Sequence, residues 1–418
     1  MMSKLSDRDI GGVSGAALLL TLTSGIAGIA ISDACYAQGV SPTSISASLS
    51  YSSDRHLLNY GDTPSSLLLL HEIGGASLSL GIAVDDDGDA ILEHSGISYD
   101  FGNVTLGFGN VERHWSFSDR TSLIMSGNAP SPTSFYVTAG QSTAPTWWPM
   151  SWIGPWSVEV FNAWTEGSDS PNGAMLLGMR FVASPIEGLE LEFVRAAQWG
   201  GGSYDSGISG LIDAATANTN EGPSSHVNQL AGFGFSLSLP ANGNGARIYG
   251  QAVGEDEAGG LPSCFMHMIG AEWSHLIAGR PVTIGIERVD TRIGRTGGGF
   301  CGPNTAYNNG TYKYTNDGTV MGAPIDTEGL STTIFGEIEL YQDLAFDFSI
   351  GSATINDANW SGHRLSTSRQ EGAFGSVGVT WSMASTEVIA GVSFQDFELE
   401  RADMPMGWSA HLSISTEF

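Results

Sequence analysis

Residues 408–418 read WSAHLSISTEF, and the character of the side chains alternates from one position to the next. One series is mostly apolar or aromatic: Trp408, Ala410, Leu412, Ile414, Thr416 and Phe418. The other series is polar: Ser409, His411, Ser413, Ser415 and Glu417. Because successive side chains of a β-strand point to opposite faces, this segment is predicted to be a strand with one apolar and one polar face. A transmembrane barrel needs such strands, with lipid outside and water or a plug inside.

The same two-residue period recurs along the chain, at 78–84, 189–193, 233–239, 332–340, 344–350 and 388–394. Clusters of Gly, Asn, Asp and Ser separate these segments and are typical of turns. An open sheet edge would leave backbone groups unpaired in lipid, so the sheet must close. The sequence therefore predicts an all-β fold, a closed antiparallel transmembrane β-barrel of about 16–18 strands. A soluble β-sandwich or propeller would show a similar alternation and is the rival fold.

The beginning of the chain has the features of an export signal. Basic residues at positions 4 and 8 precede a mostly apolar run from Gly12 to Ile31, and small side chains at Cys35 and Ala37 suit cleavage before Gln38. Residues 1–37 are therefore predicted to be a signal peptide, and the outer membrane of a Gram-negative bacterium is the predicted location. A membrane anchor is the alternative, because a run of about 20 residues can span a bilayer.

The rest of the chain is predicted to fall into two parts. Residues 38–75 are expected to form a short periplasmic segment that supplies at most a short helical plug, and residues 76–418 are expected to form the barrel. The apolar run Leu67–Leu70 leaves a second interpretation of the first part open, namely a buried first strand.

The charge balance excludes one class of partner. The chain has 16 basic and 44 acidic residues, a net charge of −28. Cleavage after Ala37 would leave 14 basic and 41 acidic residues, a net charge of −27, and Lys313 as the one remaining lysine. Nucleic acid is excluded as a partner, because its phosphates need Lys and Arg to displace their counterions.

Two cysteines, Cys264 and Cys301, remain after cleavage, each near Gly-rich sequence. In an oxidising compartment they could form a disulfide; two unrelated loop thiols are the alternative. No His or Cys cluster has the spacing of a zinc site, and the acidic run at 85–89 is interpreted as a solvated turn rather than a calcium loop. We predict no metal and no cofactor.

A block from Gly107 to Gly201 departs from simple alternation, because it is rich in Trp, Arg and other polar residues. Charged groups such as Glu112 and Arg113 are costly against lipid, so they are expected inside the barrel or at its rim, either bracing the wall or binding ligand. The tryptophans are interpreted either as an aromatic girdle at the membrane surface or as platforms for sugar rings. The candidate residues for the barrel interior or for polysaccharide binding are Glu112, Arg113, His114, Trp115, Asn128, Trp147, Trp148, Trp152, Trp156, Arg180, Arg195 and Trp199.

Catalysis is not expected from this block. His114 lies near Ser116, as in a nucleophile pair, but no third orienting residue and no nucleophile-elbow motif accompany them. We therefore predict no catalytic residue.

The block resembles the Wzi-type capsule assembly family, in the stretch GFGNVERHW at 107–115, in IGPW at 153–156, in LGMR at 177–180 and in QWGG at 198–201. The resemblance implies an outer-membrane barrel that holds capsular or related exopolysaccharide at the cell surface. Two departures are present: Ser116-Phe117-Ser118 follows the first motif, where the family usually has Gly and Pro, and the N-terminal region is shorter than a full helical plug requires. The pore is accordingly expected to be more open, or to be sealed by loops.

The predicted function is therefore a non-enzymatic outer-membrane barrel that anchors surface polysaccharide. A porin or substrate-selective channel for small solutes is the alternative, and an outer-membrane enzyme acting on lipid or glycan is a third class. The expected partners are a polysaccharide that is neutral or bridged by divalent cations, membrane lipid, and the insertion machinery that reads the strand ending at Phe418. A monomer is expected.

Overall fold

The computed structural model describes residues 44–57, 65–84, 90–148, 150–216, 227–241, 244–258, 261–294 and 301–418. The predicted signal peptide and the acidic turn at 85–89 lie outside the described residues, and so both remain predictions.

Among the described residues, nineteen strands form one sheet and two more form a small ribbon. The sheet consists of β1 (Ser44–Ser52), β2 (Ser65–Ile73), β3 (Ala76–Val84), β4 (Ala90–Leu92), β5 (Gly96–Asp100), β6 (Val104–Asn110), β7 (Thr133–Gln141), β8 (Trp156–Trp164), β9 (Met175–Ile186), β10 (Leu189–Trp199), β11 (Asn228–Ala241), β12 (Asn244–Ala258), β13 (Leu261–Ile277), β14 (Arg280–Asp290), β17 (Leu330–Tyr341), β18 (Leu344–Ile355), β19 (Gln370–Met383), β20 (Thr386–Gln395) and β21 (Gly407–Glu417). The ribbon is β15 (Thr315–Asn316) with β16 (Thr319–Val320), and the helical pieces are η3 (Met150–Ile153), a 3₁₀ turn, and α2 (Ile208–Thr216).

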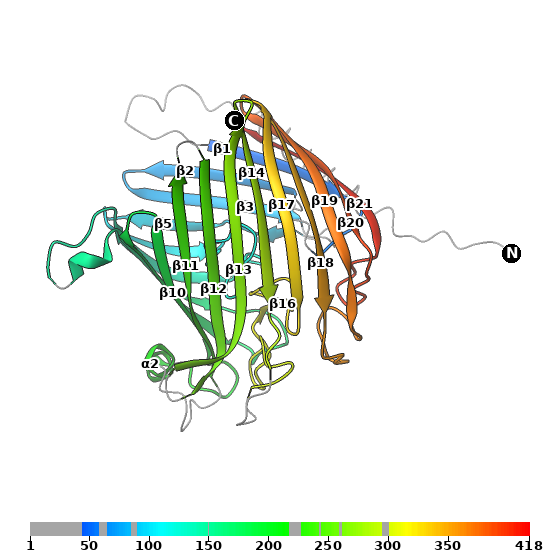
Figure 1. The fold of residues 1–418 in the computed structure, drawn as a ribbon. Helices are drawn as coiled ribbons and strands as arrows, with labels where there is room; N and C mark the ends of the chain where they lie inside the picture. The colour runs from blue at the N-terminus through cyan, green and yellow to red at the C-terminus, as the bar shows by residue number, and fades with distance from the viewer. Residues whose placement is uncertain are drawn as a thin grey trace.

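The sheet closes on itself. The strands pair antiparallel in chain order, except that β4 and β5 both pair with β3 and that β14 pairs with β17, and β1 pairs with β21 from Ser46 opposite Glu417 to Ser52 opposite His411. Both β4 and β5 pair with β3, one after the other, so they are two halves of one strand and the barrel has 18 strands. The predicted closed antiparallel barrel is confirmed, within the predicted range of strand number (Figure 1).

The start of the barrel differs from the prediction. β1 and β2 both belong to the wall, because β1 joins the last strand to β2 and β2 pairs along its length with β3. The barrel therefore already includes Ser44, and residues 44–52 and 65–73 are not a plug. The run Leu67–Leu70 does form a strand, as in the second interpretation, but it is the second strand of the wall and none of the four leucines is buried. The run of four leucines in β2 concealed the two-residue period that identified the later strands.

The two faces of the wall have opposite chemistry. On β21, Trp408, Leu412 and Ile414 are exposed on the outside, whereas Ser409 and Ser413 are buried on the inside. On β14, Ile284 and Ile286 are exposed outside, and Glu287 is buried inside. A belt of exposed apolar side chains of this extent suits lipid rather than water.

The two ends of the barrel also differ. One end has two-residue turns at 187–188, 342–343 and 384–385, and the C-terminus lies there (Figure 1). The other end carries long connections, which include 111–132 and 356–369. Outer-membrane barrels have short periplasmic turns and longer extracellular loops, so these are the periplasmic end and the extracellular end.

No helix among the described residues is both long and apolar enough to span a membrane.

The outward position of Ile286, near the middle of β14, yields a test of the assigned faces. Ile286→Arg places a charge against lipid and is expected to lower the free energy of unfolding by about 2–4 kcal/mol. Denaturant titration of the protein in bilayers measures this change. The control Ser168→Arg, on an exposed extracellular loop, is expected to stay within about 0.5 kcal/mol of the parent protein. Equal stability of the two variants would contradict the assignment.

Candidate functional site

The connection between β6 and β7, residues 111–132, folds into the barrel; we call it the inner loop. Trp115 is fully buried, its ring centroid lies 5.4 Å from that of Phe161 on β8, and its Nε1 donates to Glu159 Oε2 at 3.2 Å. The carbonyl oxygen of Trp115 accepts a hydrogen bond of 2.6 Å from Gln251 on β12. The inner loop thus contacts wall strands that lie far apart in the sequence.

Arg113 braces the inner loop against the wall. Its side chain is 1% exposed, and Nε donates to Glu159 Oε1 at 2.7 Å. The guanidinium lies 3.9 Å from the centre of the Phe161 ring and also donates to Ser134 Oγ at 3.1 Å. A charge this deeply buried requires a paired and hydrogen-bonded partner, which Glu159 provides.

Two further ion pairs line the interior in the same way. Arg180 on β9 pairs with Glu192 on β10 at 2.9 Å, and Arg247 on β12 pairs with Glu272 on β13 at 2.8 Å. Arg247 Nη1 also donates to the carbonyl oxygen of Phe117 in the inner loop, at 2.7 Å. Arg113, Arg180 and Arg247 are therefore each neutralised by a glutamate, and all three also donate to backbone oxygens.

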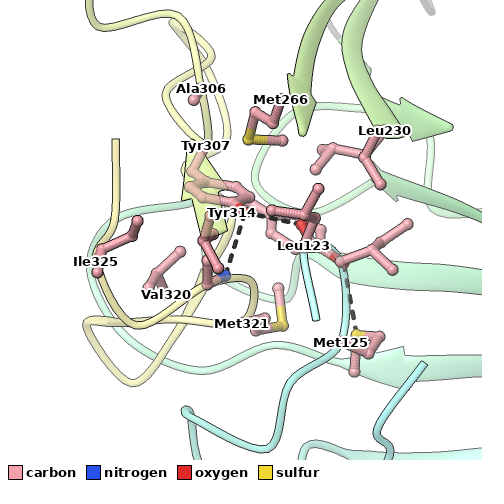
Figure 2. Close-up of a cluster of buried hydrophobic side chains, with 14 of the residues drawn as sticks. Leu123, Met125, Leu230, Met266, Ala306, Tyr307, Tyr314, Val320, Met321 and Ile325 are labelled. Atoms are coloured by element: carbon pink, nitrogen blue, oxygen red, sulfur yellow. Dashed lines mark hydrogen bonds between the residues drawn. The ribbon is translucent and has the colours of Figure 1, made fainter. Parts of the chain in front are cut away.

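The connection between β14 and β17 covers the inner loop from the extracellular side; we call its residues 301–329 the cap loop. Tyr307 and Tyr314 are fully buried in it, and the Tyr307 hydroxyl donates to the Leu123 carbonyl oxygen at 2.8 Å (Figure 2). Burial raises the pKa of Tyr307 well above its usual value, so the hydroxyl is neutral at physiological pH. Asn128 Nδ2 of the inner loop donates to the Val320 carbonyl oxygen at 2.9 Å.

A disulfide joins the cap loop to the wall. Cys264 on β13 is bonded to Cys301 at the start of the cap loop, with 5.4 Å between the two Cα atoms. The sequence left two alternatives for these cysteines, a disulfide or two unrelated thiols, and the structure contains the disulfide.

The two loops fill the lumen with a hydrophobic core. One buried cluster joins Trp115 and Tyr314 of the loops to Phe161 on β8, Met266 on β13 and Phe374 on β19. Figure 2 shows part of this cluster, with Leu123, Met125 and Tyr307 packed together. Because the cluster reaches wall strands on many sides, the barrel is packed with side chains at this level. This arrangement corresponds to the predicted seal by loops. On the periplasmic side of the inner loop lies a cavity of about 540 Å³, lined by Asp119, Glu272, Asp347 and His411 among others.

The remaining polar candidates of the inner loop have local contacts. Glu112 is exposed, with Oε2 4.0 Å from His94 Nε2. The ring nitrogens of His114 lie 2.7 Å and 3.2 Å from the carbonyl oxygens of Ser118 and Ser126. His114 therefore holds the shape of the inner loop.

The tryptophans between β7 and β8 do not reach the extracellular side. Trp147, Trp148 and Trp152 lie at the periplasmic end and are 62%, 86% and 66% exposed, and Trp156 begins β8 at the same end. An extracellular sugar platform built from these four residues is therefore not present.

Arg195 and Trp199 lie on the outer face of the wall, which excludes the barrel interior, one of the two places expected for them; polysaccharide binding by these residues stays a prediction. Both residues lie an even number of positions after Phe193 on β10, so their side chains point to the same face as Phe193, which is exposed outside. Glu192 points to the opposite face, into the barrel. Helix α2 covers them: Trp199 packs with Ala214, and Arg195 donates to the carbonyl oxygens of Ala214 and Ala215. These two residues attach α2 to the outside of the barrel near its extracellular end.

The extracellular rim holds polar and aromatic residues that were not among the predicted candidates. On the loop between β18 and β19, Trp360 lies beside exposed Asn359, and its backbone N donates to Asn356 Oδ1 at 2.7 Å. Arg369 pairs with Asp357 at 2.9 Å and with Glu371 at 2.6 Å. The hydrogen bond from Arg369 lowers the pKa of Asp357. We call Asp357, Asn359, Trp360, Arg369 and Glu371 the rim patch.

The rim patch has the groups that carbohydrate recognition uses. An indole face packs against the C–H groups of a sugar ring, and carboxylate, amide and guanidinium groups bond its hydroxyls. The sequence signal was a Trp among Asp, Asn and Arg in the polar stretch between two alternating segments. Among the described residues, no group of three or more His, Cys, Asp and Glu side chains is placed to hold a metal ion.

Comparison with known proteins identifies relatives. The model of the family described as capsule assembly protein Wzi matches residues 34–404. A protein of Klebsiella pneumoniae, described as an uncharacterized 55.8 kDa protein in the cps region, is 37% identical over 196 residues. That match covers 46% of this chain and 38% of the Klebsiella protein, which is well under two thirds of its length.

Solved structures share the fold. Wzi of Escherichia coli, described as a carbohydrate-binding β-barrel involved in group 1 capsule assembly, superimposes with a TM-score of 0.75 at 22% identity, over 100% of this chain and 90% of that one. The outer-membrane protein OprD of Pseudomonas aeruginosa superimposes with a TM-score of 0.52 at 9% identity, over 90% and 92% of the two chains. A BenF-like porin of Pseudomonas fluorescens gives 0.51 at 9% identity, over 90% and 98%. At these identities the likeness concerns the fold alone.

The buried pair Arg113–Glu159 yields a stability prediction. Glu159→Gln leaves the Arg113 charge buried without a counter-charge and is expected to cost about 3–5 kcal/mol. The double variant Arg113→Met/Glu159→Gln is expected to recover most of that loss. Denaturant titration measures both, with Glu187→Gln in an exposed turn as the control. A Glu159→Gln variant as stable as the control would show that the pair does not brace the inner loop.

The disulfide yields a second prediction. Reduction of Cys264–Cys301 is expected to destabilise the cap loop by about 2–4 kcal/mol, because the detached loop gains conformational entropy when it leaves the lumen. Limited proteolysis followed by mass spectrometry should then show faster cleavage within residues 301–329. The variant Cys264→Ser/Cys301→Ser serves as the control, since its cleavage should not respond to reductant. Identical cleavage of the oxidised and reduced protein would refute this role of the disulfide.

Proposed function

Because the chain belongs to the Wzi capsule assembly family, we propose that it is a non-enzymatic outer-membrane barrel that binds polysaccharide and holds it at the cell surface. The family match also confirms the resemblance found in the block from Gly107 to Gly201.

The filled lumen is the observation that carries this proposal. A channel for solutes requires an open path, whereas here the inner loop and the cap loop form a hydrophobic core inside the barrel. Trp115, Tyr307 and Tyr314 are fully buried in that core, and Cys264–Cys301 attaches the cap loop to the wall. These contacts favour an anchor at the surface over a porin, even though porins share the fold.

The rim patch is the place on the described extracellular surface where we expect polysaccharide to bind. Trp360 would provide a flat apolar face, and Arg369, Asp357 and Asn359 would bond hydroxyl groups beside it. A single sugar contact is weak, but a polymer offers many repeats, so that avidity supplies the retention.

The charge of the chain constrains the polymer. Without residues 1–37 the protein has a net charge of −27 and repels acidic glycans within a Debye length of about 8–10 Å. We therefore expect a neutral polysaccharide, or an acidic one that divalent cations bridge to the rim carboxylates.

Retention of polysaccharide tests the proposed function. Deletion of the gene is expected to shift surface polysaccharide from the cells to the medium, and the parent gene should restore it. Trp360→Ala/Arg369→Ala is expected to restore at least about tenfold less retention, because it removes both the stacking face and the central cation of the rim patch. Trp381→Ala, on the periplasmic half of β19, is the matched control and should restore retention fully.

The same strains test the porin alternative. Deletion of the gene should leave the uptake of small solutes unchanged. The purified protein should give a conductance near background in planar bilayers. Unchanged retention together with altered solute uptake would reject the anchor in favour of a channel.

Binding of purified host polysaccharide with and without calcium tests the charge argument. A neutral polymer should bind equally in both, and an acidic one should lose at least about tenfold in affinity in chelator. Tight binding of a highly acidic polymer in chelator would refute the expectation.

A further inference from the structure

The connection between β7 and β8, residues 142–155, is unusual for the periplasmic end; we call it the Trp loop. Other connections at that end, such as 187–188 and 384–385, have two residues. The Trp loop contains the η3 turn and projects away from the barrel at the left of Figure 1. It presents Trp147, Trp148 and Trp152 to its surroundings, so three large aromatic rings are exposed on one short segment.

The composition of the Trp loop points to lipid as its surroundings. Residues 141–156 read QSTAPTWWPMSWIGPW and include none of the 16 basic and 44 acidic residues of the chain. Exposing three indoles to water is costly, because each ring carries a large apolar area. Segments rich in Trp and free of charge are typical of the boundary between lipid headgroups and acyl chains.

The Trp loop leaves the wall at the level where its neighbours still face lipid. Trp156 pairs with Ala183 on β9, and β9 continues for three residues to Ile186, which is 64% exposed. On the other side, beyond β6, the exposed rings of Tyr99 and Phe101 lie 4.6 Å apart. The exposed tryptophans are therefore continuous with the lipid-facing belt.

The base of the Trp loop is held firmly. Ile153 is buried, and Gly154 adopts a φ of +72° in contact with β9. A Cβ atom at Gly154 would lie 1.8 Å from the Ser184 carbonyl oxygen, so only glycine fits there. The backbone N of Ser184 donates to the Pro155 carbonyl oxygen at 2.9 Å. A fixed base allows the rings to be presented without a large loss of entropy on docking.

We propose that the Trp loop docks into the periplasmic leaflet of the outer membrane, with Trp147, Trp148 and Trp152 at the level of the phospholipid headgroups. The loop then fixes the height and the tilt of the barrel in the membrane. This docking is independent of polysaccharide binding on the extracellular side.

Site-specific labelling tests the docking. In the protein without residues 1–37, which include Cys35, Trp148→Cys provides one accessible thiol, because Cys264 and Cys301 form a disulfide. The full mature protein, carrying a polarity-sensitive fluorophore at this position, is reconstituted into vesicles of phosphatidylethanolamine and phosphatidylglycerol. Nitroxide-labelled phospholipid is expected to quench it at least about twofold more strongly than it quenches the control Ser168→Cys, on an exposed extracellular loop. Aqueous iodide should show the opposite order.

A second variant measures the consequence of docking. Trp147→Ala/Trp148→Ala/Trp152→Ala is expected to lower the thermal midpoint in vesicles but not in detergent micelles, which surround the barrel without a defined leaflet. The shift of the folded band on unheated gels verifies that every variant is folded. Iodide quenching at position 148 as strong as at position 168, with no effect of nitroxide lipid, would overturn the proposal. That outcome would point instead to a periplasmic protein as the partner of the loop.

Discussion

The absence of hydrogen-bonding partners in lipid is the constraint on which the rest of the structure depends. Every backbone N–H and C=O group of the wall must bond to another strand, so β1 must meet β21 and the sheet must close. Closure in turn divides the side chains into two sets. Apolar residues such as Ile286 face lipid, and every polar group of the membrane-spanning wall has to find its partner inside the barrel or at its rims.

The inside of the barrel is then packed and hydrogen-bonded like the core of a soluble protein. Arg113, Arg180 and Arg247 each pair with a glutamate, and the inner loop adds the carbonyl oxygens of Ser116 and Phe117 as acceptors for Arg180 and Arg247. Because the lumen is filled, binding partners in the water can reach only the two ends of the barrel, and these ends differ in chemistry. The extracellular rim carries ion pairs and Trp360, whereas the periplasmic end carries the uncharged Trp loop with its exposed indoles. The two ends are thus suited to different partners.

Several residues show how far sequence reasoning reaches. Alternation predicted the strands, and the expectation that Arg113 lies inside followed from the cost of a charge in lipid. The same alternation, continued from Phe193, already places Arg195 and Trp199 outside, so the interior alternative for these two residues could have been excluded from the sequence. The position of Trp148 was harder to predict, because the end at which a loop lies depends on counting every strand before it. β2 was not recognised among those strands, since its four consecutive leucines show no two-residue period. β1 does alternate, with Ile45, Ala47, Leu49 and Tyr51 separated by serines, so the sequence already contained the signal for it.

The sequence by itself determined the fold class, the family and the chemistry of the two faces of the wall, because these follow from local alternation and from motifs that lie close together in the chain. Only the tertiary structure decided that residues 111–132 and 301–329 fill the lumen and that Cys264 is bonded to Cys301. It also decided that the rim patch, rather than Trp147, Trp148, Trp152 and Trp156, lies on the extracellular side. Those outcomes depend on contacts between segments that are far apart in the chain, which closure of the barrel brings together.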